Sequence, residues 1–330
     1  MHNVHYYETD SLDPCSNLAF EEYLLTNHRE EDILLLWQNE PSVIIGAHQN
    51  TAEEIDRSYV EEHGIHVVRR STGGGAVYHD LGNLNYSFIT DVEDRENLSL
   101  QAFTKPVIKA LDSMGVKATA TGKNDILIGD CKVSGTAQRL DGDRVLHHGT
   151  LLFDSDLSVV SAALSPHPEK YASKSKKSVR SRVGNIREML PRDMDLQTFW
   201  RRLLHALTRE ETTIPEWLCD AEREVVARLA DEKYRSYEWN YGRNPAYSLK
   251  GKQRTDGGTL EVYADVQKGT LSNLQLFGDF MARKPSSELE EALKGCPFQA
   301  DDVKAVLATV PLEDYLGGVT EEEFLQLLFD

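Results

Sequence analysis

Short strand-like segments follow one another closely over the first half of this chain, and this spacing restricts the fold most. Apolar or alternating runs typical of strands occur at 33–38, 42–46, 67–70, 75–79, 84–90, 126–128, 132–139 and 146–153. Helical patterns at 13–25, 56–63 and 99–114 interrupt them at irregular intervals. A parallel sheet needs a helix between nearly all of its strands, so this order favours an α+β fold built on a mixed sheet.

The length of the chain predicts two domains, because 330 residues exceed the ~100–200 residues of an ordinary domain. The clearest break is the segment Tyr241-Gly242-Arg243-Asn244-Pro245, which is rich in turn-forming residues. We therefore expect a large domain at residues 1–245 and a small domain at residues 246–330.

Two pairs of strand-like runs predict hairpins. The runs at 33–38 and 42–46 flank a polar turn that contains a proline, and the runs at 259–266 and 271–277 flank a turn that contains a glycine. Three short helices are expected after the second hairpin. The small domain is therefore predicted to be α+β as well.

Charge restricts the partners of the chain. Acidic residues outnumber basic ones by 54 to 36, which gives a formal net charge of −18. Nucleic acids and anionic membranes attract positively charged faces, so we expect neither as a partner. The longest apolar runs are far shorter than the ~20 residues of a membrane-spanning helix. No secretory signal is recognisable, and the four cysteines are widely separated, so we expect reduced thiols and a cytoplasmic protein.

Two arginines and three consecutive glycines form the strongest local signal, in the segment Arg69-Arg70-Ser71-Thr72-Gly73-Gly74-Gly75-Ala76-Val77-Tyr78-His79-Asp80. Glycines let backbone N–H groups approach an anion closely, and an arginine grips two phosphate oxygens through its planar guanidinium. The segment therefore suits a phosphate site between two strands. The alternative is a tight turn beside arginines of no special role, because a glycine run also suits a sharp bend.

A second polar cluster contains Asn124-Asp125 and Lys132-Val133-Ser134-Gly135. Small residues surround Lys132 at the start of a predicted strand, so its ammonium group can lie in a cleft. There it can hold a carboxylate beside an α-phosphate oxygen while charge develops between them. Asp125 is a candidate ligand for Mg²⁺, which usually binds one or two carboxylates together with substrate phosphates. A surface lysine and an aspartate in a turn are the alternatives.

Two adjacent histidines, His147 and His148, lie in a third predicted strand. Neighbouring side chains on a strand face opposite ways, so only one of the two can face a given site. His148 is a candidate for proton transfer or phosphate binding. A structural histidine with satisfied hydrogen bonds is the alternative.

Together and in this order, these clusters resemble the lipoate-protein ligase family of the two-domain type. The segments that carry the resemblance are Arg70 to Asp80, Asn124-Asp125, Lys132 to Gly135, His147 to Leu152, Ser178 to Val183 and Glu238 to Gly242. The resemblance covers nearly the whole chain. It implies a biotin/lipoate ligase-type catalytic domain, with a mixed sheet flanked by helices, and a small C-terminal accessory domain.

The resemblance also implies roles for individual residues. The residues implied at an ATP site are Arg70, Gly75, Ala76, Val77, Tyr78 and Lys132. The residues implied beside lipoate are Trp37, Gly74, His79 and Lys132. Lys132 contacts both substrates in this scheme and is the implied catalytic residue. We expect the apolar tail of lipoate in a slot lined by Val43, Ile45 and Leu84.

The implied activity is the ATP-dependent attachment of lipoate to protein lysines through lipoyl-AMP, with Mg²⁺ accompanying the nucleotide. The implied acceptors are the lipoyl domains of 2-oxoacid dehydrogenase complexes and the H protein of the glycine cleavage system. The basic run from Lys170 to Arg182 is then expected to be either a lid over the reactive anhydride or a docking strip for an acidic acceptor domain. A solvated loop is the third interpretation of this run.

Three other functions remain open at this point. An octanoyl or lipoyl transferase of the same fold would use a cysteine thioester and no ATP, and Cys131 is the cysteine close to the implied site. Alternation along the strand points Cys131 away from the side that Lys132 faces. A non-catalytic lipoyl-domain-binding protein and a biotin ligase are the remaining alternatives.

Overall fold

The computed structural model describes residues 4–92, 100–121, 124–164, 183–210, 213–241, 249–267 and 269–329. The chain packs into two compact units that are not continuous in sequence. The large unit comprises residues 1–44, 55–68 and 77–236, and the small unit comprises residues 45–54, 69–76 and 237–330. The domain boundary predicted at residue 245 lies outside the described residues and stays a prediction.

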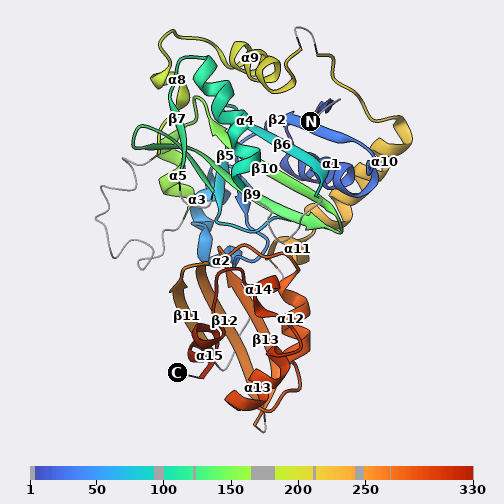
Figure 1. Cartoon of the computed structure of the whole chain (residues 1–330), viewed down its shortest axis with the longest axis vertical. Helices are drawn as coiled ribbons and strands as arrows, with labels where there is room; N and C mark the ends of the chain where they lie inside the picture. Colours follow the sequence, from blue (N-terminus) through green and yellow to red (C-terminus); the bar gives the residue numbers. More distant parts are fainter. Residues whose placement is uncertain are drawn as a thin grey trace. The chain divides into compact units, whose positions relative to one another are not determined.

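The large unit contains a seven-stranded mixed sheet, several strands of which are labelled in Figure 1. Its strand order is β1-β2-β6-β10-β9-β8-β7. The strands are β1 (Val4–Glu8), β2 (Asp32–Trp37), β6 (Asn83–Asp91), β10 (Arg144–Leu152), β9 (Cys131–Asp141), β8 (Asp125–Ile128) and β7 (Ala118–Thr121). The pair β1–β2 is parallel, and the other neighbours are antiparallel. This arrangement confirms the mixed sheet predicted from the spacing of the strands.

The hairpin predicted from 33–38 and 42–46 is wrong. β2 pairs with β1 and β6, whereas β3 (Ser42–Ile45) belongs to a separate three-stranded sheet with β4 (His66–Arg69) and β5 (Val77–His79). β2 is buried beyond its first residue, and β3 is buried throughout. A strand buried on both faces lies inside a sheet with a partner on each side, which an isolated hairpin cannot supply.

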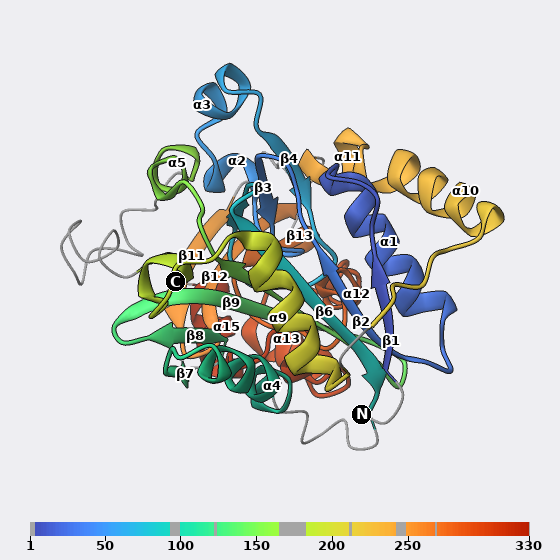
Figure 2. The ribbon, with the colours of Figure 1, turned by 90° about the horizontal axis from the view of Figure 1, so that it is seen from above.

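Helices cover both faces of the seven-stranded sheet. The helices α4 (Leu100–Ser113) and α9 (Leu196–Thr208) contact each other across one face (Figure 2). Their apolar residues, such as Val107 and Phe199, join a core with Phe88 of β6. The opposite face carries α1 (Pro14–Asn27), which Asp13 caps by accepting hydrogen bonds from the backbone of the first turn.

Within the described residues, the large unit also contains the helices α3 (Arg57–Glu62), α5 (Leu157–Ala163), α8 (Ile186–Met189) and α10 (Asp220–Leu229). A π-helical turn at Ala230–Tyr234 continues α10 and packs against α1. No helix within the described ranges is both long and apolar enough to cross a membrane.

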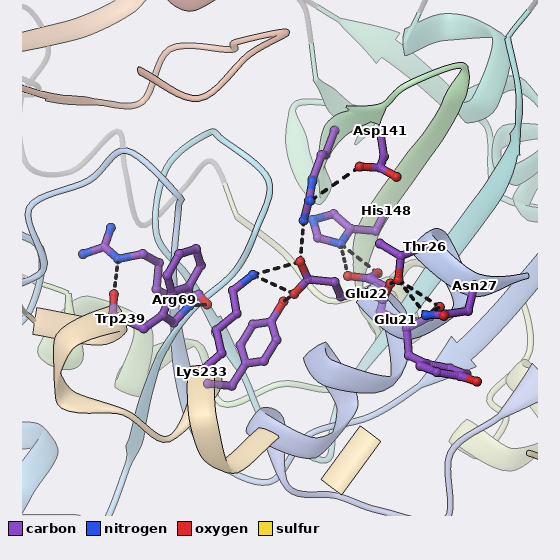
Figure 3. A network of polar contacts seen from close by, with 12 residues as sticks. Glu21, Glu22, Thr26, Asn27, Arg69, Asp141, His148, Lys233 and Trp239 are labelled. Carbon is purple, nitrogen blue, oxygen red and sulfur yellow. Dashed lines mark hydrogen bonds and ion pairs between the residues drawn. The ribbon is translucent and has the colours of Figure 1, made fainter. Parts of the chain in front are cut away.

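Helix α1 holds a buried carboxylate, Glu22, that the π-helical turn surrounds with donors. Lys233 Nζ lies 2.8 and 2.7 Å from the two Glu22 oxygens, and Tyr234 donates at 2.6 Å (Figure 3). Arg139 of β9 donates to the same carboxylate at 2.8 Å. Burial opposes ionisation, but the two cations and the hydrogen bonds lower the pKa of Glu22 to about 2. These contacts tie α1 to the sheet and to the C-terminal end of α10.

The alternation predicted for the two histidines of β10 is confirmed. His147 faces α4, where its ring stacks on Phe103 with the ring centres 5.0 Å apart and Nδ1 lies 3.0 Å from Gln138 Nε2. His148 faces α1 on the other side of the sheet, where it contacts Glu21. Burial, together with the charge of His148, lowers the pKa of His147 to about 3.

The small unit contains an antiparallel sheet of β11 (Leu249–Thr255), β12 (Gly258–Gln267) and β13 (Thr270–Gly278). The predicted hairpin of β12 and β13 is confirmed. Four helices follow where three were expected, namely α12 (Ser286–Leu293), α13 (Ala300–Leu307), α14 (Leu312–Tyr315) and α15 (Glu321–Phe329). The short helices α2 (Thr51–Glu54) and α11 (Tyr237–Tyr241) also belong to this unit.

Substitution of His147 with Phe is expected to reduce the loss in the free energy of unfolding when the pH is lowered from 7 to 5. The unfolded chain takes up a proton on His147 below its ordinary pKa of 6.5, whereas the folded chain does not until about 3. The contribution of neutral His147 to the free energy of unfolding is therefore complete above pH 6.5. This contribution is lost as the pH falls toward 3, at roughly 1.4 kcal/mol per pH unit. Urea unfolding at pH 7 and pH 5 measures this loss, and an equal loss in both proteins would contradict the prediction.

Candidate active site

The candidate lysine and aspartate of the large unit lie together. Lys132 Nζ is 2.7 Å from Asp125 Oδ1, across the β9–β8 pair. A Cβ atom on Gly135 would lie 3.3 Å from Lys132 Nζ, so the lysine side chain lies over a position where a larger residue would crowd it. Gly135 N also donates to Thr150 Oγ1 on β10 at 3.2 Å. The structure thus brings together the second cluster found in the sequence.

This ion pair is accessible to a ligand. The side chains of Lys132 and Asp125 are 33% and 17% exposed, so the ammonium group is neither buried in the core nor fully solvated. The carbonyl of Asn124 accepts hydrogen bonds from Thr136 N and Oγ1 and thereby fixes the chain just before Asp125. A partly desolvated ammonium group of this kind can stabilise an anion more strongly than a lysine in bulk water.

Trp37 and His148 are joined through a buried hydrogen-bond relay. Trp37 Nε1 donates to Ser87 Oγ at 3.0 Å, and Ser87 Oγ donates to Glu21 Oε1 at 2.5 Å. His148 Nδ1 lies 2.9 and 3.1 Å from the two Glu21 oxygens. Glu21 and Ser87 were not predicted as site residues, because only the tertiary structure shows that they meet.

His79 lies beside this relay. Its ring meets the Trp37 indole edge to face, with the ring centres 6.0 Å apart, and Asn39 Nδ2 lies 3.0 Å from Nδ1. The two side chains implied to contact lipoate, Trp37 and His79, are therefore neighbours. Leu84 joins the core under α4 and α9, on the face of β6 opposite to Ser87. Val43 is fully buried where it pairs with Tyr78.

In the small unit, Arg70 folds into its own glycine loop. Arg70 Nε donates to Thr72 Oγ1 at 2.9 Å, and Nη2 donates to the carbonyls of Gly73 and Gly75 at 2.5 and 2.9 Å. Gly74 has a φ of +87°, which glycine adopts without strain. The guanidinium that was implied to bind ATP therefore also shapes the loop. Ala76 ends this segment, whereas Val77 and Tyr78 belong to β5 in the large unit.

Arg69, the first of the two arginines that the sequence linked to a phosphate site, is a buried scaffold residue. Its guanidinium donates to the carbonyls of Gly46, Gln49 and Trp239 at 2.9, 2.6 and 2.9 Å. It also donates to Thr51 Oγ1 at 2.7 Å and to the Asn240 carbonyl at 3.2 Å.

The family-like segment around Trp239 completes this arrangement. Trp239 Nε1 donates to the Arg69 carbonyl at 2.8 Å, and Asn240 Oδ1 accepts from Arg69 N at 2.7 Å. Figure 3 shows Trp239 beside Arg69. Arg69 is thus bonded through both its backbone and its side chain. The basic run from Lys170 to Arg182 lies outside the described residues.

We expect Arg69→Lys to lower the free energy of unfolding by roughly 2–4 kcal/mol, because an ammonium group cannot reach the acceptors that a planar guanidinium serves, and buried carbonyls lose their donors. Urea unfolding measures the change. Arg201→Lys, at an exposed position of α9, is the matched control and should change stability by less than about 0.5 kcal/mol. Equal effects of the two substitutions would contradict the scaffold role.

Comparisons with known proteins agree with this fold and these motifs. Residues 13–208 match the model of the lipoyl protein ligase A/B catalytic domain. Residues 244–328 match the model of the bacterial lipoate protein ligase C-terminus.

Two curated relatives are similar over nearly the whole chain. Lipoate–protein ligase 1 of Staphylococcus aureus is 42% identical over 318 residues, which cover 96% of this chain and 97% of the relative. Lipoate-protein ligase LplJ of Bacillus subtilis is 42% identical over 321 residues, with coverages of 96% and 97%.

Solved structures show the same fold. Plasmodium falciparum LipL1 in complex with lipoate has a TM-score of 0.81 at 23% identity, covering 98% of this chain and 97% of its own. A bi-partite lipoate protein ligase from Thermoplasma acidophilum, studied with its E2 lipoyl domain, has a TM-score of 0.65 at 30% identity, with coverages of 75% and 98%. A lipoate-protein ligase A bound with ATP has a TM-score of 0.63 at 29% identity, with coverages of 73% and 98%. The resemblance seen in the sequence is therefore confirmed, and this chain belongs to the lipoate-protein ligase family.

Proposed function

We propose that this chain activates lipoate with ATP as lipoyl-AMP and transfers the lipoyl group to a lysine of an acceptor protein. The observation that carries the proposal is the Lys132–Asp125 pair over Gly135, at the motif positions of a chain 42% identical to two lipoate-protein ligases. The lipoate-protein ligase A solved with bound ATP supports the nucleotide, and the names of the two relatives that are 42% identical support lipoate.

The first half-reaction requires charge stabilisation and alignment. A lipoate carboxylate oxygen attacks the α-phosphorus of ATP, the bond to the bridging oxygen breaks, and pyrophosphate leaves. Negative charge gathers between the carboxylate and the α-phosphate. Lys132 is suited to bind both groups, because its ammonium group is partly desolvated and already faces a carboxylate.

The other site residues keep the roles that the resemblance implied. We assign Arg70, Gly75, Ala76, Val77 and Tyr78 to ATP. Lipoate is assigned to Trp37, Gly74 and His79. The Trp37–Ser87–Glu21–His148 relay supports this, because a side chain held by buried hydrogen bonds pays little ordering entropy when a ligand arrives.

Asp125 is the proposed carboxylate for Mg²⁺. Within the described residues, no group of three or more His, Cys, Asp or Glu side chains could hold a metal by itself. A single carboxylate still suits Mg²⁺, which completes its coordination with phosphate oxygens and water. The ion would neutralise phosphate charge beside Lys132.

The second half-reaction joins the acyl group to the acceptor. The neutral amine of the acceptor lysine attacks the carbonyl carbon of lipoyl-AMP, AMP leaves, and an amide forms. We propose the lipoyl domains of 2-oxoacid dehydrogenase complexes and the glycine cleavage H protein as acceptors. The Thermoplasma ligase studied with its E2 lipoyl domain supports this class of acceptor. The use of ATP and of such acceptors, together with free cysteines, supports a cytoplasmic location.

The transferase alternative gains no support from the position of Cys131. A Cβ atom on Gly184 would lie 3.1 Å from Cys131 Cβ and 3.4 Å from Sγ, so the cysteine faces Gly184. Lys132 instead lies over Gly135 and contacts Asp125. The two neighbours on β9 therefore have different surroundings.

Lys132→Ala is expected to reduce lipoate-dependent exchange of pyrophosphate into ATP by at least about 100-fold, the size of effect seen when a group that stabilises developing charge is removed. Unfolding should change by no more than about 1 kcal/mol, because a partly exposed ion pair contributes little. Lys117→Ala, at an exposed position, is the control and should retain full exchange. Unimpaired exchange in Lys132→Ala would overturn the assignment.

Cys131→Ser is expected to retain ATP-dependent lipoylation within about threefold, because no enzyme thioester takes part. Mass spectrometry of a purified acceptor domain after incubation with enzyme, ATP and lipoate measures the product, with each component omitted in turn. Loss of product in Cys131→Ser while Lys132→Ala stays active would favour the transferase.

A further inference from the structure

The glycine loop at residues 72–75 packs directly against C-terminal residues within the small unit. A Cβ atom on Gly73 would lie 2.8 Å from the Phe280 carbonyl oxygen and 3.6 Å from His48 Cδ2. The loop therefore fits closely between Phe280 and His48. Phe280 follows β13 and is more than 200 positions away from the loop in sequence, so no local pattern predicts this contact.

His48 is fixed on the C-terminal residues by three contacts. Its ring stacks on Phe280, with the ring centres 4.9 Å apart and the planes 16° from parallel. Its carbonyl accepts from Gly278 N at 2.6 Å. Its Nδ1 lies 3.3 Å from Ser286 Oγ, which donates to Glu290 Oε1 at the same distance.

The contacts continue from His48 into the glycine loop. The neighbouring Ala47 N donates to the Thr72 carbonyl at 2.8 Å. Arg70 then links Thr72 to the carbonyls of Gly73 and Gly75. A continuous path of direct contacts therefore runs from α12 through His48 to the loop.

We propose that His48 and Phe280 are positioning residues, through which the C-terminal residues hold the glycine loop in its ATP-binding conformation. The inference rests on the proposed function of the loop. Three consecutive glycines lose much conformational freedom when they are ordered, and contacts outside the loop must offset that loss. When His48 is present, the loop is ordered before ATP arrives. Without His48, part of the free energy of ATP binding has to be used to order the loop.

His48→Ala is the decisive variant, because it removes the stacking and the Ser286 contact while the fully buried Phe280 remains. The KM for ATP in lipoate-dependent pyrophosphate exchange should rise about tenfold, the consequence of losing part of the preorganisation. The kcat should change by less than about threefold. His48→Phe restores an aromatic stack and should return the KM to within about threefold of the unmodified protein.

Phe298→Ala is the matched control, because Phe298 packs on Phe329 and against the hydrophobic core of the same unit. It should lower the stability of the small unit and leave the KM for ATP unchanged. An unchanged KM in His48→Ala would overturn the proposal. An equal rise in Phe298→Ala would overturn it as well, because the effect would then be general destabilisation.

Hydrogen exchange separates this inference from the proposed function. The amides of residues 72–76 should exchange faster in His48→Ala than in the unmodified protein, with or without substrates. If the unmodified protein shows no lipoate-dependent exchange of pyrophosphate, the proposed function fails, and the amide rates still decide whether His48 orders the loop. Equal amide rates in the two proteins would overturn the positioning role.

Discussion

Two adjacent buried carboxylates on α1, Glu21 and Glu22, impose the arrangement on which the large unit depends. A carboxylate removed from water costs several kcal/mol unless charges and donors compensate it. Glu22 is compensated by Lys233, Arg139 and Tyr234, which tie α1 to β9 and to the π-helical turn. Glu21 is compensated from β6 and β10, by Ser87 and His148. These contacts hold the helix on the sheet, and Trp37 and His148 are linked to it through Ser87 and Glu21.

Most of the fold could be predicted from apolar patterns, and the omissions have physical causes. The central strands β6 and β10 have apolar residues in alternating positions or short runs and are buried over most of their length, so their sequence pattern identifies them. The edge strand β7 is largely exposed, and β11 reads LKGKQRT, so neither shows a strand pattern. The mistaken hairpin arose because pairing partners depend on contacts far apart in sequence, and β1, the parallel partner of β2, was not predicted.

The candidate site was predictable where its chemistry is local in sequence. Lys132 and Asp125 lie in neighbouring short strands, and the structure brings them together as an ion pair. The relay residues Glu21 and Ser87 carry no such signal, since their role comes from partners on other elements. Arg69 is the clearest case. An arginine beside a glycine run indicates an anion site, yet this side chain serves backbone carbonyls of its own unit.

The contacts of Arg69 with Trp239 and Asn240 also determine where this polypeptide can be shortened. A chain that ends before Trp239 keeps the buried guanidinium but loses the Trp239 and Asn240 carbonyls and the Asn240 amide. Such a fragment would expose the segments at 45–54 and 69–76 to proteases and to self-association. A terminus placed beyond Tyr241 retains these acceptors. An N-terminal fragment of this chain therefore has a minimum length, which the hydrogen bonds to Arg69 determine.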